Sequence, residues 1–371
     1  MKVLFLLGSL NTGGAETLVL DIFRNYRYSE DFQITGLYRK KGNLESDYIS
    51  TNIPFNYFPV KRNVFLYIIR LRQFVIGNKI NLIHTHQLLD GFIALLATFN
   101  LSVKVVQSVH SFDFNLSKKQ QWFRKWVLSR SDKNIFVSYI QLKYYNRKYN
   151  LMTDKQFVVY NGINFNKFDN LQKQNINYNL RKELNIQDST LLMGMVGNFN
   201  EGRDQMTVCR FLKLLNEQAV DFHFVFVGKR VENTAQRYDD CVSFCQKNNL
   251  SQRVTFAGVR NDVPAILSQL DAFIYSTEHD TFGIAVVEAI ASGTPVFVND
   301  WEVMNEITEG GKLAVIYKTK DENDLLEKFM LFLQKQEEYV SRAKENAEIV
   351  RKKYSIEKHI ENLKEVYLSL H

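Results

Sequence analysis

Residues 271–298, DAFIYSTEHDTFGIAVVEAIASGTPVFV, constrain the fold more than any other stretch of this chain. Their pattern predicts a short apolar strand over residues 271–276, an almost wholly apolar helix over residues 282–291 and a second strand over residues 296–298. The Gly-Thr-Pro sequence ends the helix before the second strand. Two buried strands joined by a buried helix form a βαβ unit, which is typical of parallel sheets. We therefore expect an α/β fold.

Two carboxylates of this stretch require a polar environment. Glu288 lies within the apolar helix, where an ionised carboxylate must be paired, neutral or turned into a polar cleft. Asp280 lies in the loop at the carboxyl end of the first strand, where open parallel sheets bind ligands. The helix start at Phe282 and Gly283 offers backbone N–H groups to an anion. Together these residues predict a ligand site, whereas the alternative is an ordinary βαβ element with Glu288 in a structural ion pair.

Strands and helices alternate along the whole chain, which predicts an α/β protein with two doubly wound, Rossmann-like sheets. With 371 residues, of which 45% are hydrophobic, the chain is long enough for two domains. The expected strands cover residues 2–7, 33–38, 55–58, 81–84, 104–108, 191–196, 222–227, 271–276, 296–298 and 313–316. We expect a linker in the polar, Asn-rich residues 166–179, and hence a first domain over residues 1–165 and a second over residues 166–355.

Residues 280–295 resemble a known family. Asp280, Phe282, Gly283 and Glu288, with the Ala, Gly, Thr and Pro that follow them, match the pattern E-G-F-G-x-x-x-x-E-A-x-A-x-G-T-P of the retaining GT-B glycosyltransferases of family 4.

Other parts of the chain carry the same resemblance. The GGAE sequence of residues 13–16 resembles the first loop of that family, and residues 158–163 resemble its end-of-domain strand and turn. The resemblance implies a GT-B fold, in which two Rossmann-like domains face a cleft and the last helix, residues 356–371, crosses back onto the first domain.

The resemblance also implies a function. A sugar would move from a nucleotide sugar, UDP-linked rather than GDP-linked, to a glycan or lipid-linked acceptor in cell-surface polysaccharide synthesis. The carboxyl domain would bind the donor and the amino domain the acceptor. No cofactor or metal would be required, because cations and helix N-termini neutralise the leaving diphosphate. The donor phosphate would help to deprotonate the acceptor hydroxyl, so no protein nucleophile is expected.

Residue roles follow from the same resemblance. The catalytic residues that it implies are Asp280, His110 and Arg203. The donor-binding residues that it implies are Gly14, Gly197, Asn198, Arg203, Lys229, Val259, Arg260, Phe282, Gly283, Ile284 and Glu288. The acceptor-side residues that it implies are Gly13, Glu16 and His86.

The chain departs from the family pattern in three places. Asp280 stands where most members have Glu, so its contact with the donor sugar requires a shift of about one methylene; Glu278 is near, but its register does not fit the motif. Asn198 and Arg203 stand at the positions of the usual phosphate-binding Arg and Lys. One phosphate cation is thus missing, and the other has a planar fork that binds phosphate bidentately.

Alternative functions rest on weaker patterns. The loop after the first strand lacks G-x-G-x-x-G, so a nicotinamide site is not favoured. Cys209, Cys241 and Cys245 have no partners at metal-ligand spacing, and His84 with His86 is a pair too small to predict a metal. A GT-B nucleotide-sugar epimerase or phosphorylase, or a non-catalytic sugar-nucleotide-binding protein, would share the fold and remains open.

Charge and composition bear on location and partners. Residues 1–178 carry 24 Lys and Arg against 11 Asp and Glu, whereas residues 179–371 carry 23 against 29. The segment KKQQWFRKWVLSR from Lys118 places cations among tryptophans, which suits either a helix on an anionic membrane surface or a packed helix with a solvated face. No motif supports nucleic-acid binding. Three cysteines and the absence of a membrane-length apolar run predict a cytoplasmic protein, peripheral at the inner face of the membrane if the first reading holds.

Overall fold

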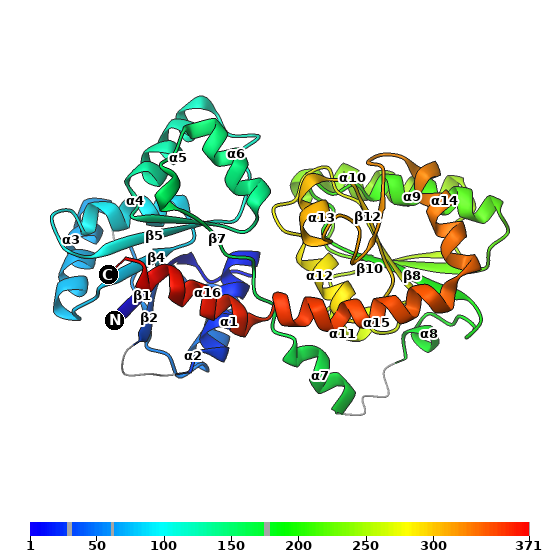
Figure 1. Cartoon of the computed structure of the whole chain (residues 1–371), viewed down its shortest axis with the longest axis horizontal. Coiled ribbons are helices and arrows are strands. Elements are labelled where there is room, and N and C mark those ends of the chain that lie inside the picture. Colours follow the sequence, from blue (N-terminus) through cyan, green and yellow to red (C-terminus); the bar gives the residue numbers. More distant parts are fainter. Residues whose placement is uncertain (28–31, 61–62, 174–178, 371) are drawn as a thin grey trace. The chain divides into compact units, whose positions relative to one another are not determined.

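The computed structural model describes residues 1–27, 32–60, 63–173 and 179–370, and these form two α/β units (Figure 1). Unit 1 consists of residues 1–163 with 356–371, and unit 2 consists of residues 164–355. Each unit contains one sheet, and every strand pair in both sheets is parallel. This agrees with the two doubly wound, Rossmann-like sheets predicted from the alternation of strands and helices.

The sheet of unit 1 has the strand order β3-β2-β1-β4-β5-β6-β7. Its strands are β1 (Lys2–Ser9), β2 (Gln33–Lys40), β3 (Phe55–Tyr57), β4 (Leu82–Thr85), β5 (Lys104–Val109), β6 (Lys133–Phe136) and β7 (Gln156–Val158). Its helices are α1 (Gly14–Asn25), α2 (Glu45–Ile49), α3 (Val64–Gly77), α4 (Leu88–Ala97), α5 (Lys118–Arg130), α6 (Tyr139–Tyr149) and α16 (Ile356–Leu368), and a short 3₁₀ turn covers Thr153–Lys155.

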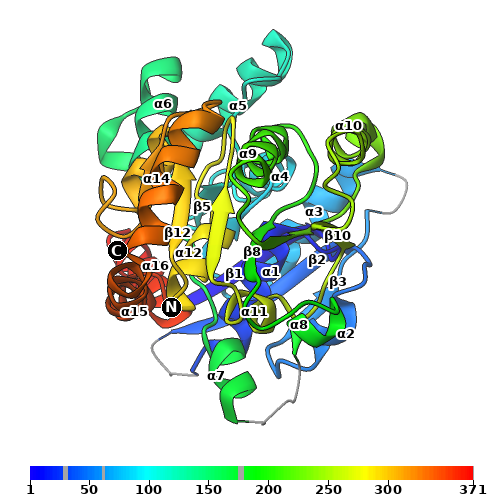
Figure 2. The ribbon, with the colours of Figure 1, turned by 90° about the vertical axis from the view of Figure 1, so that its right-hand side faces the viewer.

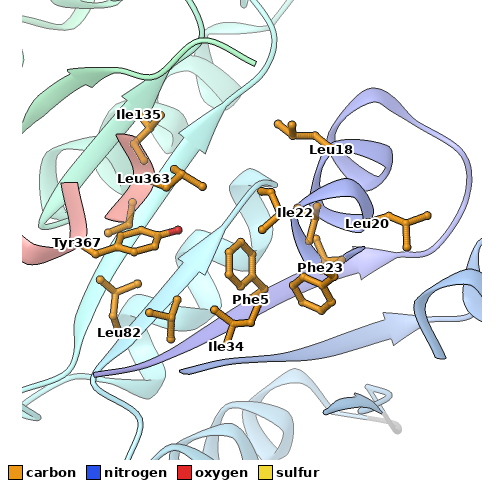
Figure 3. Packing of buried hydrophobic residues seen from close by; sticks show 14 of the residues in the cluster. Phe5, Leu18, Leu20, Ile22, Phe23, Ile34, Leu82, Ile135, Leu363 and Tyr367 are labelled. Carbon is orange, nitrogen blue, oxygen red and sulfur yellow. The ribbon is translucent and has the colours of Figure 1, made fainter. Parts of the chain in front are cut away.

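Strand β1 is buried on both faces, which explains its continuous apolar sequence. Val3 and Phe5 pack into one hydrophobic cluster with residues of α1 and α16 (Figure 3). Leu4 and Leu6 point to the opposite face and pack into a second cluster with residues of α3 and α4. Leu363, Val366 and Tyr367 bury one side of α16 against the first cluster, so this C-terminal helix is part of the unit 1 core.

The sheet of unit 2 has the strand order β10-β9-β8-β11-β12-β13. Its strands are β8 (Leu191–Val196), β9 (Phe222–Val227), β10 (Val254–Gly258), β11 (Ala272–Tyr275), β12 (Val296–Asn299) and β13 (Val315–Tyr317). Its helices are α7 (Asn166–Lys173), α8 (Leu180–Glu183), α9 (Gln205–Glu217), α10 (Ala235–Lys247), α11 (Val263–Leu267), α12 (Ile284–Ala291), α13 (Glu302–Ile307), α14 (Glu322–Gln334) and α15 (Gln336–Lys353), with a 3₁₀ turn at Glu232–Thr234. Helices α9 and α14 pack together on one face of the sheet, and α12 and α15 on the other (Figure 2).

In both sheets the chain adds strands first on one side of a central strand and later on the other side, and we call this point the strand reversal. In unit 1 the chain leaves β1 for β2 on one side, and β4 later pairs with β1 on the other side. In unit 2 strand β8 is likewise flanked by β9 and β11. In open parallel sheets, ligands bind outside the carboxyl ends of the strands at such a reversal. The loops after β1 and β4, and those after β8 and β11, are therefore the places to look for a site.

Two expectations about local structure are wrong. The expected linker over residues 166–179 is helical in its first part, because α7 covers Asn166–Lys173; residues 174–178 lie outside the described residues. The helix expected to begin at Phe282 begins at Ile284, because Gly283 precedes it with a φ of +84°. In the described parts of the chain, no helix combines the length and apolar character needed to cross a membrane.

Candidate functional site

An ion pair occupies the strand reversal of unit 2. Arg203, in the loop between β8 and α9, places Nη1 3.0 Å from Oδ2 of Asp280, in the loop after β11. The guanidinium also lies over the ring of Tyr275, with its carbon 5.1 Å from the ring centroid. Nε of Arg203 is buried and has no hydrogen-bond partner among the described residues. One edge of this planar fork is thus held by a carboxylate, while Nε keeps an unused donor.

Asp280 is held by more than its ion pair. Its Oδ2 accepts a hydrogen bond from the Tyr275 hydroxyl at 2.6 Å, and its Oδ1 accepts one from the backbone N–H of Phe282 at 3.3 Å. Burial by itself would raise the pKa of Asp280, but the guanidinium of Arg203 and these hydrogen bonds outweigh it and lower the pKa. Asp280 is therefore an ionised carboxylate with a fixed position at neutral pH.

The backbone fixes the position of Arg203. Residues Arg203 and Thr277 form an antiparallel bridge, so the two loops run side by side. Gly202 has a φ of +89°, and a Cβ there would lie 2.5 Å from the His279 ring, so only glycine fits this turn. Its carbonyl accepts hydrogen bonds from the Thr277 hydroxyl and the Glu278 N–H. Asp204 then caps α9 by accepting a bond from the Thr207 N–H.

The start of α12 lies beside this pair. Gly283 is its N-cap, and a Cβ at this position would meet the Met304 side chain at 2.8 Å. The Phe282 ring is buried against Tyr354. The backbone N–H of Phe282 already donates to Asp280, so only the N–H groups of the residues after it could bind the predicted anion. Ile284 is exposed and Glu288 is partly buried on the same helix.

The other predicted donor-side residues lie in loops at the same end of the sheet. Asn198 accepts a hydrogen bond at Oδ1 from the backbone N–H of Lys229, so it joins the loops after β8 and β9. The Lys229 side chain is exposed. A Cβ on Gly197 would lie 3.2 Å from Arg203 Nε, so the glycine gives that guanidinium room.

The loop after β10 supplies Val259 and Arg260. Val259 is 68% exposed, which makes it an unusual apolar side chain on this surface. Arg260 forms a bidentate ion pair with Glu183 and bonds to Asp262, so its side chain has a structural role. Glu278, whose register does not fit the motif, forms ion pairs with Arg237 and Lys320.

The strand reversal of unit 1 brings together the predicted acceptor-side residues. Glu16 is buried and accepts a hydrogen bond from the Gln87 side chain at 2.9 Å, which joins the loops after β1 and β4. A Cβ on Gly13 would lie 2.4 Å from the Glu16 carboxylate, whereas Gly14 faces open space. His86 Nδ1 lies 2.9 Å from His110 Nε2, and the two rings are stacked. These residues form a connected polar group.

Four histidines of unit 1 lie near one another. His84 contacts the Ser108 hydroxyl through Nε2 and the Tyr367 hydroxyl of α16 through Nδ1. His359 of α16 bonds to the Tyr160 carbonyl at 2.6 Å. Burial lowers the pKa of His84 and His86 well below the usual value, and lowers the pKa of His110 and His359 to about 4. All four are therefore neutral at pH 7.

The cysteines and histidines bear on whether the described residues contain a metal site. In the described ranges, no group of three or more His, Cys, Asp or Glu side chains has the geometry to hold a metal ion. Cys209 of α9 lies 3.8 Å from Cys245 of α10, and Cys241 is buried beside them. These thiols pack the interface between two helices.

Three residues of these sites were missed in the sequence. In the sequence, Tyr275 looks like an ordinary buried strand residue. Because a buried tyrosine hydroxyl needs a hydrogen-bond partner, it could have indicated a polar group nearby. Gln87 gives no signal by itself. Arg124 belongs to the cations of the segment from Lys118, for which a membrane surface and a solvated face were both open, but it donates to the Tyr145 hydroxyl and to the Ser111 carbonyl in the loop after β5.

Comparisons with known families agree with this architecture. The family model "Glycosyltransferase Family 4" matches residues 12–167, and the model "Glycosyl transferases group 1" matches residues 177–350. The chain belongs to the GT-B glycosyltransferases of family 4. Crystal structures of Anabaena HepE have this fold: the complex with UDP superposes with a TM-score of 0.86 at 18% identity, over 100% of both chains. Family membership thus agrees with the resemblance of residues 280–295.

Two curated relatives are named as glycosyltransferases. It is 24% identical over 241 residues to the O-antigen biosynthesis glycosyltransferase WclY of Escherichia coli, a match that spans 62% of each protein. It is also 24% identical over 297 residues to the UDP-Gal:α-D-GlcNAc-diphosphoundecaprenol α-1,3-galactosyltransferase of Escherichia coli, which covers 73% of this chain and 72% of that relative. The first match spans less than two thirds of the relative's length.

The histidines predict that unit 1 of the transferase loses stability in mild acid. An unfolded histidine has a pKa of about 6.5, whereas the folded value of His359 is about 4, so the unfolded state binds more protons between these values. The contribution of His359 to the free energy of unfolding is fully present above about pH 6.5. It falls by about 3 kcal/mol as the pH is lowered to 4. Asp90, whose pKa burial raises to about 6, opposes this trend.

Urea unfolding at several pH values tests this expectation. In a Trp301→Phe background the remaining tryptophans, Trp122 and Trp126, report on unit 1. The variant His359→Asn keeps a donor for the Tyr160 carbonyl but cannot titrate, so its stability should change less between pH 7 and pH 4.5. An unchanged pH dependence in this variant would contradict the role given to His359.

Proposed function

We propose that this transferase moves a sugar, with retention of configuration, from a nucleotide sugar bound by unit 2 to a glycan or lipid-linked acceptor bound by unit 1. The observation that carries the proposal is the Arg203–Asp280 pair at the strand reversal of unit 2. It provides a fixed cation for a diphosphate and a fixed carboxylate for a sugar hydroxyl next to each other.

The donor is proposed to be UDP-linked. Structures of HepE were obtained with UDP and with UDP-glucose, and the Escherichia coli galactosyltransferase named above uses UDP-Gal. Glu288 would bind the ribose hydroxyls, and exposed Val259 would lie against the base. The acceptor is proposed to be an intermediate of a cell-surface polysaccharide, as the names of the relatives suggest.

The proposed chemistry needs no metal and no protein nucleophile. As the diphosphate leaves, negative charge develops on its oxygens, and the unused Nε–H of Arg203 is placed to stabilise it. The N-terminus of α12 adds a favourable dipole. Asp280 would orient the sugar, since its carboxylate is held by Tyr275 and Arg203 and cannot swing away.

Binding of the donor tests this assignment directly. With EDTA in the buffer, UDP-sugars should raise the thermal unfolding midpoint more than GDP- or ADP-sugars do. A ligand at about 100 times its dissociation constant adds about 2.7 kcal/mol of stability. Stabilisation that requires added Mg²⁺ or Mn²⁺ would contradict the metal-free site, and no response to any nucleotide sugar would contradict the proposed function.

Arg203 is the residue whose loss should matter most for turnover. Removing a cation that stabilises the leaving group in a water-poor site should lower kcat by roughly 100-fold or more in Arg203→Ala. Arg203→Lys should be milder, because it keeps the charge. The matched control is Arg210→Ala, which removes an arginine of α9 that pairs with Glu322 on the surface. Near-normal turnover in Arg203→Ala would remove Arg203 from the site.

We also propose that unit 1 works at an anionic membrane surface. Helix α3 leaves Val64, Phe65, Leu66, Ile69 and Ile76 exposed. Helix α4 packs between α3 and α5, and α5 exposes Trp122 together with Lys118, Lys119 and Lys125. Apolar and cationic side chains on one set of neighbouring helices suit a bilayer with anionic headgroups.

Liposome co-sedimentation tests the membrane proposal. Each cation near an anionic surface contributes about 1 kcal/mol, so the variant Lys118, Lys119, Lys125→Glu should lose most binding to anionic vesicles. A control with the same charge change on unit 2 is Lys335, Lys344, Lys352→Glu, three exposed lysines of α15 and its N-cap. Binding should weaken between 0.1 M and 1 M salt, as the Debye length falls from about 10 Å to about 3 Å. Equal binding to neutral vesicles, or equal loss in both variants, would favour a solvated face.

A further inference from the structure

A small cavity of unit 1 lies at the carboxyl ends of β4 and β5, beside α5. Its volume is about 70 Å³, and its polar lining comes from His86, Gln107, Ser108, His110, Ser111 and Arg124. One water needs only about 10–15 Å³ of such a cavity, so this cavity has room for a group of several heavy atoms. No carboxylate is among its lining residues.

Two buried nitrogens of residues that line this cavity have no hydrogen-bond partner in the described chain. His86 is 7% exposed, and its Nε2 makes no hydrogen bond there. The second donor is Nε of Arg124, which is shielded from solvent and equally without an acceptor. Buried polar atoms normally have partners, and each exception needs an explanation. Two of them in one cavity indicate a ligand that supplies acceptors.

The charge of Arg124 is also uncompensated. Its Nη1 donates to the Tyr145 hydroxyl and lies 3.5 Å from the Ser111 carbonyl, and no carboxylate of the described residues lies within ion-pair distance of it. Asp113, the acidic residue of the same loop, is occupied by Lys148, Tyr144 and Tyr149. A partly buried cation without a counter-ion is costly, so an anion in this cavity would be favourable.

The histidine pair gives the cavity a second donor. When His110 Nε2–H donates to His86 Nδ1, the proton of the neutral His86 ring lies on Nε2 and points to the unpaired side. In that tautomer Nε2–H and the Arg124 Nε–H both serve as donors. This arrangement matches a group with several negatively charged oxygens, since charge-assisted hydrogen bonds are the strong ones.

We propose that this cavity binds one anionic group of the acceptor, a phosphate or a carboxylate, through Arg124 Nε–H and His86 Nε2–H. That the anion belongs to the acceptor rests on the proposed function, whereas the anion site itself rests on the two unpaired nitrogens. Arg124 is then a binding residue for the acceptor, separate from Arg203, which serves the donor.

Titration with inorganic pyrophosphate in the presence of saturating UDP tests the anion site, because UDP occupies the donor site. Wild-type protein should bind pyrophosphate, and Arg124→Gln should weaken that binding at least tenfold. The matched control is Lys125→Gln, which removes the exposed cation next along α5 and should stay within twofold of wild type. Arg203→Gln should also bind pyrophosphate under these conditions as wild type does. Circular dichroism and the unfolding midpoint establish that the Arg124 variant is folded.

Three results would overturn the proposal. Unchanged binding in Arg124→Gln would exclude the cavity, and equal loss in Lys125→Gln would indicate general attraction to a basic surface. Absence of pyrophosphate binding once UDP is saturating would mean that the anion belongs to the donor.

A pair of acceptors tests whether the anion is the acceptor's. Arg124→Gln should raise KM at least tenfold for a sugar linked to a prenyl diphosphate, with little change in kcat, and Arg124→Lys should recover part of the loss. For the same sugar as a neutral alkyl glycoside, KM should be unaffected. Equal losses with both acceptors would show a structural role and overturn the assignment. If no sugar were transferred to either acceptor, the proposed function would fail, while the pyrophosphate titration would still decide the anion site.

Discussion

The pairing of buried charges at the carboxyl ends of the central strands is the constraint on which the rest of the structure depends. In unit 2 Asp280 is held by Arg203 and Tyr275, and in unit 1 buried Asp90 is held by Arg39 at 2.7 Å. A charge left unpaired in such places costs several kcal/mol, so the first pair fixes two loops of unit 2 and the second joins β2 to α4 in unit 1. The polar groups at the strand reversals are therefore rigid before any ligand arrives, which is what binding and catalysis require.

The departures from the family pattern make physical sense together. Asn198 replaces a cation and instead joins two loops through the backbone N–H of Lys229. Arg203 takes over the position of a lysine, and its fork holds Asp280 with one edge and keeps Nε for another acceptor. Asp280 is shorter than the usual glutamate, and its ion pair and the Tyr275 hydroxyl hold it in place. The proposed phosphate site thus has one cation fewer than the family pattern, and the remaining cation, Arg203, is held in position by Asp280.

The two units differ in their electrostatics. Unit 1, residues 1–163 with 356–371, carries 24 Lys and Arg against 13 Asp and Glu, and its buried histidines are neutral at pH 7. Its positive charge therefore comes from lysines and arginines, among them the exposed Lys118, Lys119 and Lys125 of α5, and such a field attracts anionic partners over distances near the Debye length. In unit 2 the cation at the strand reversal is paired with Asp280. A negatively charged acceptor and a negatively charged donor would accordingly find different kinds of site in the two units.

The sequence by itself determined the two parallel sheets, the buried strand β1 and the βαβ unit that carries Asp280 and Glu288. It also determined the family. These depend on the period of apolar residues and on a motif contained in one short stretch, so they can be read locally. Only the tertiary structure decided that Tyr275 holds Asp280, that residues 166–173 form α7, and that Arg124 and His86 line one cavity. Arg203 and Asp280 become partners because β8 and β11 are neighbours in the sheet. Strand order depends on how whole elements pack over both faces, and no local pattern encodes it.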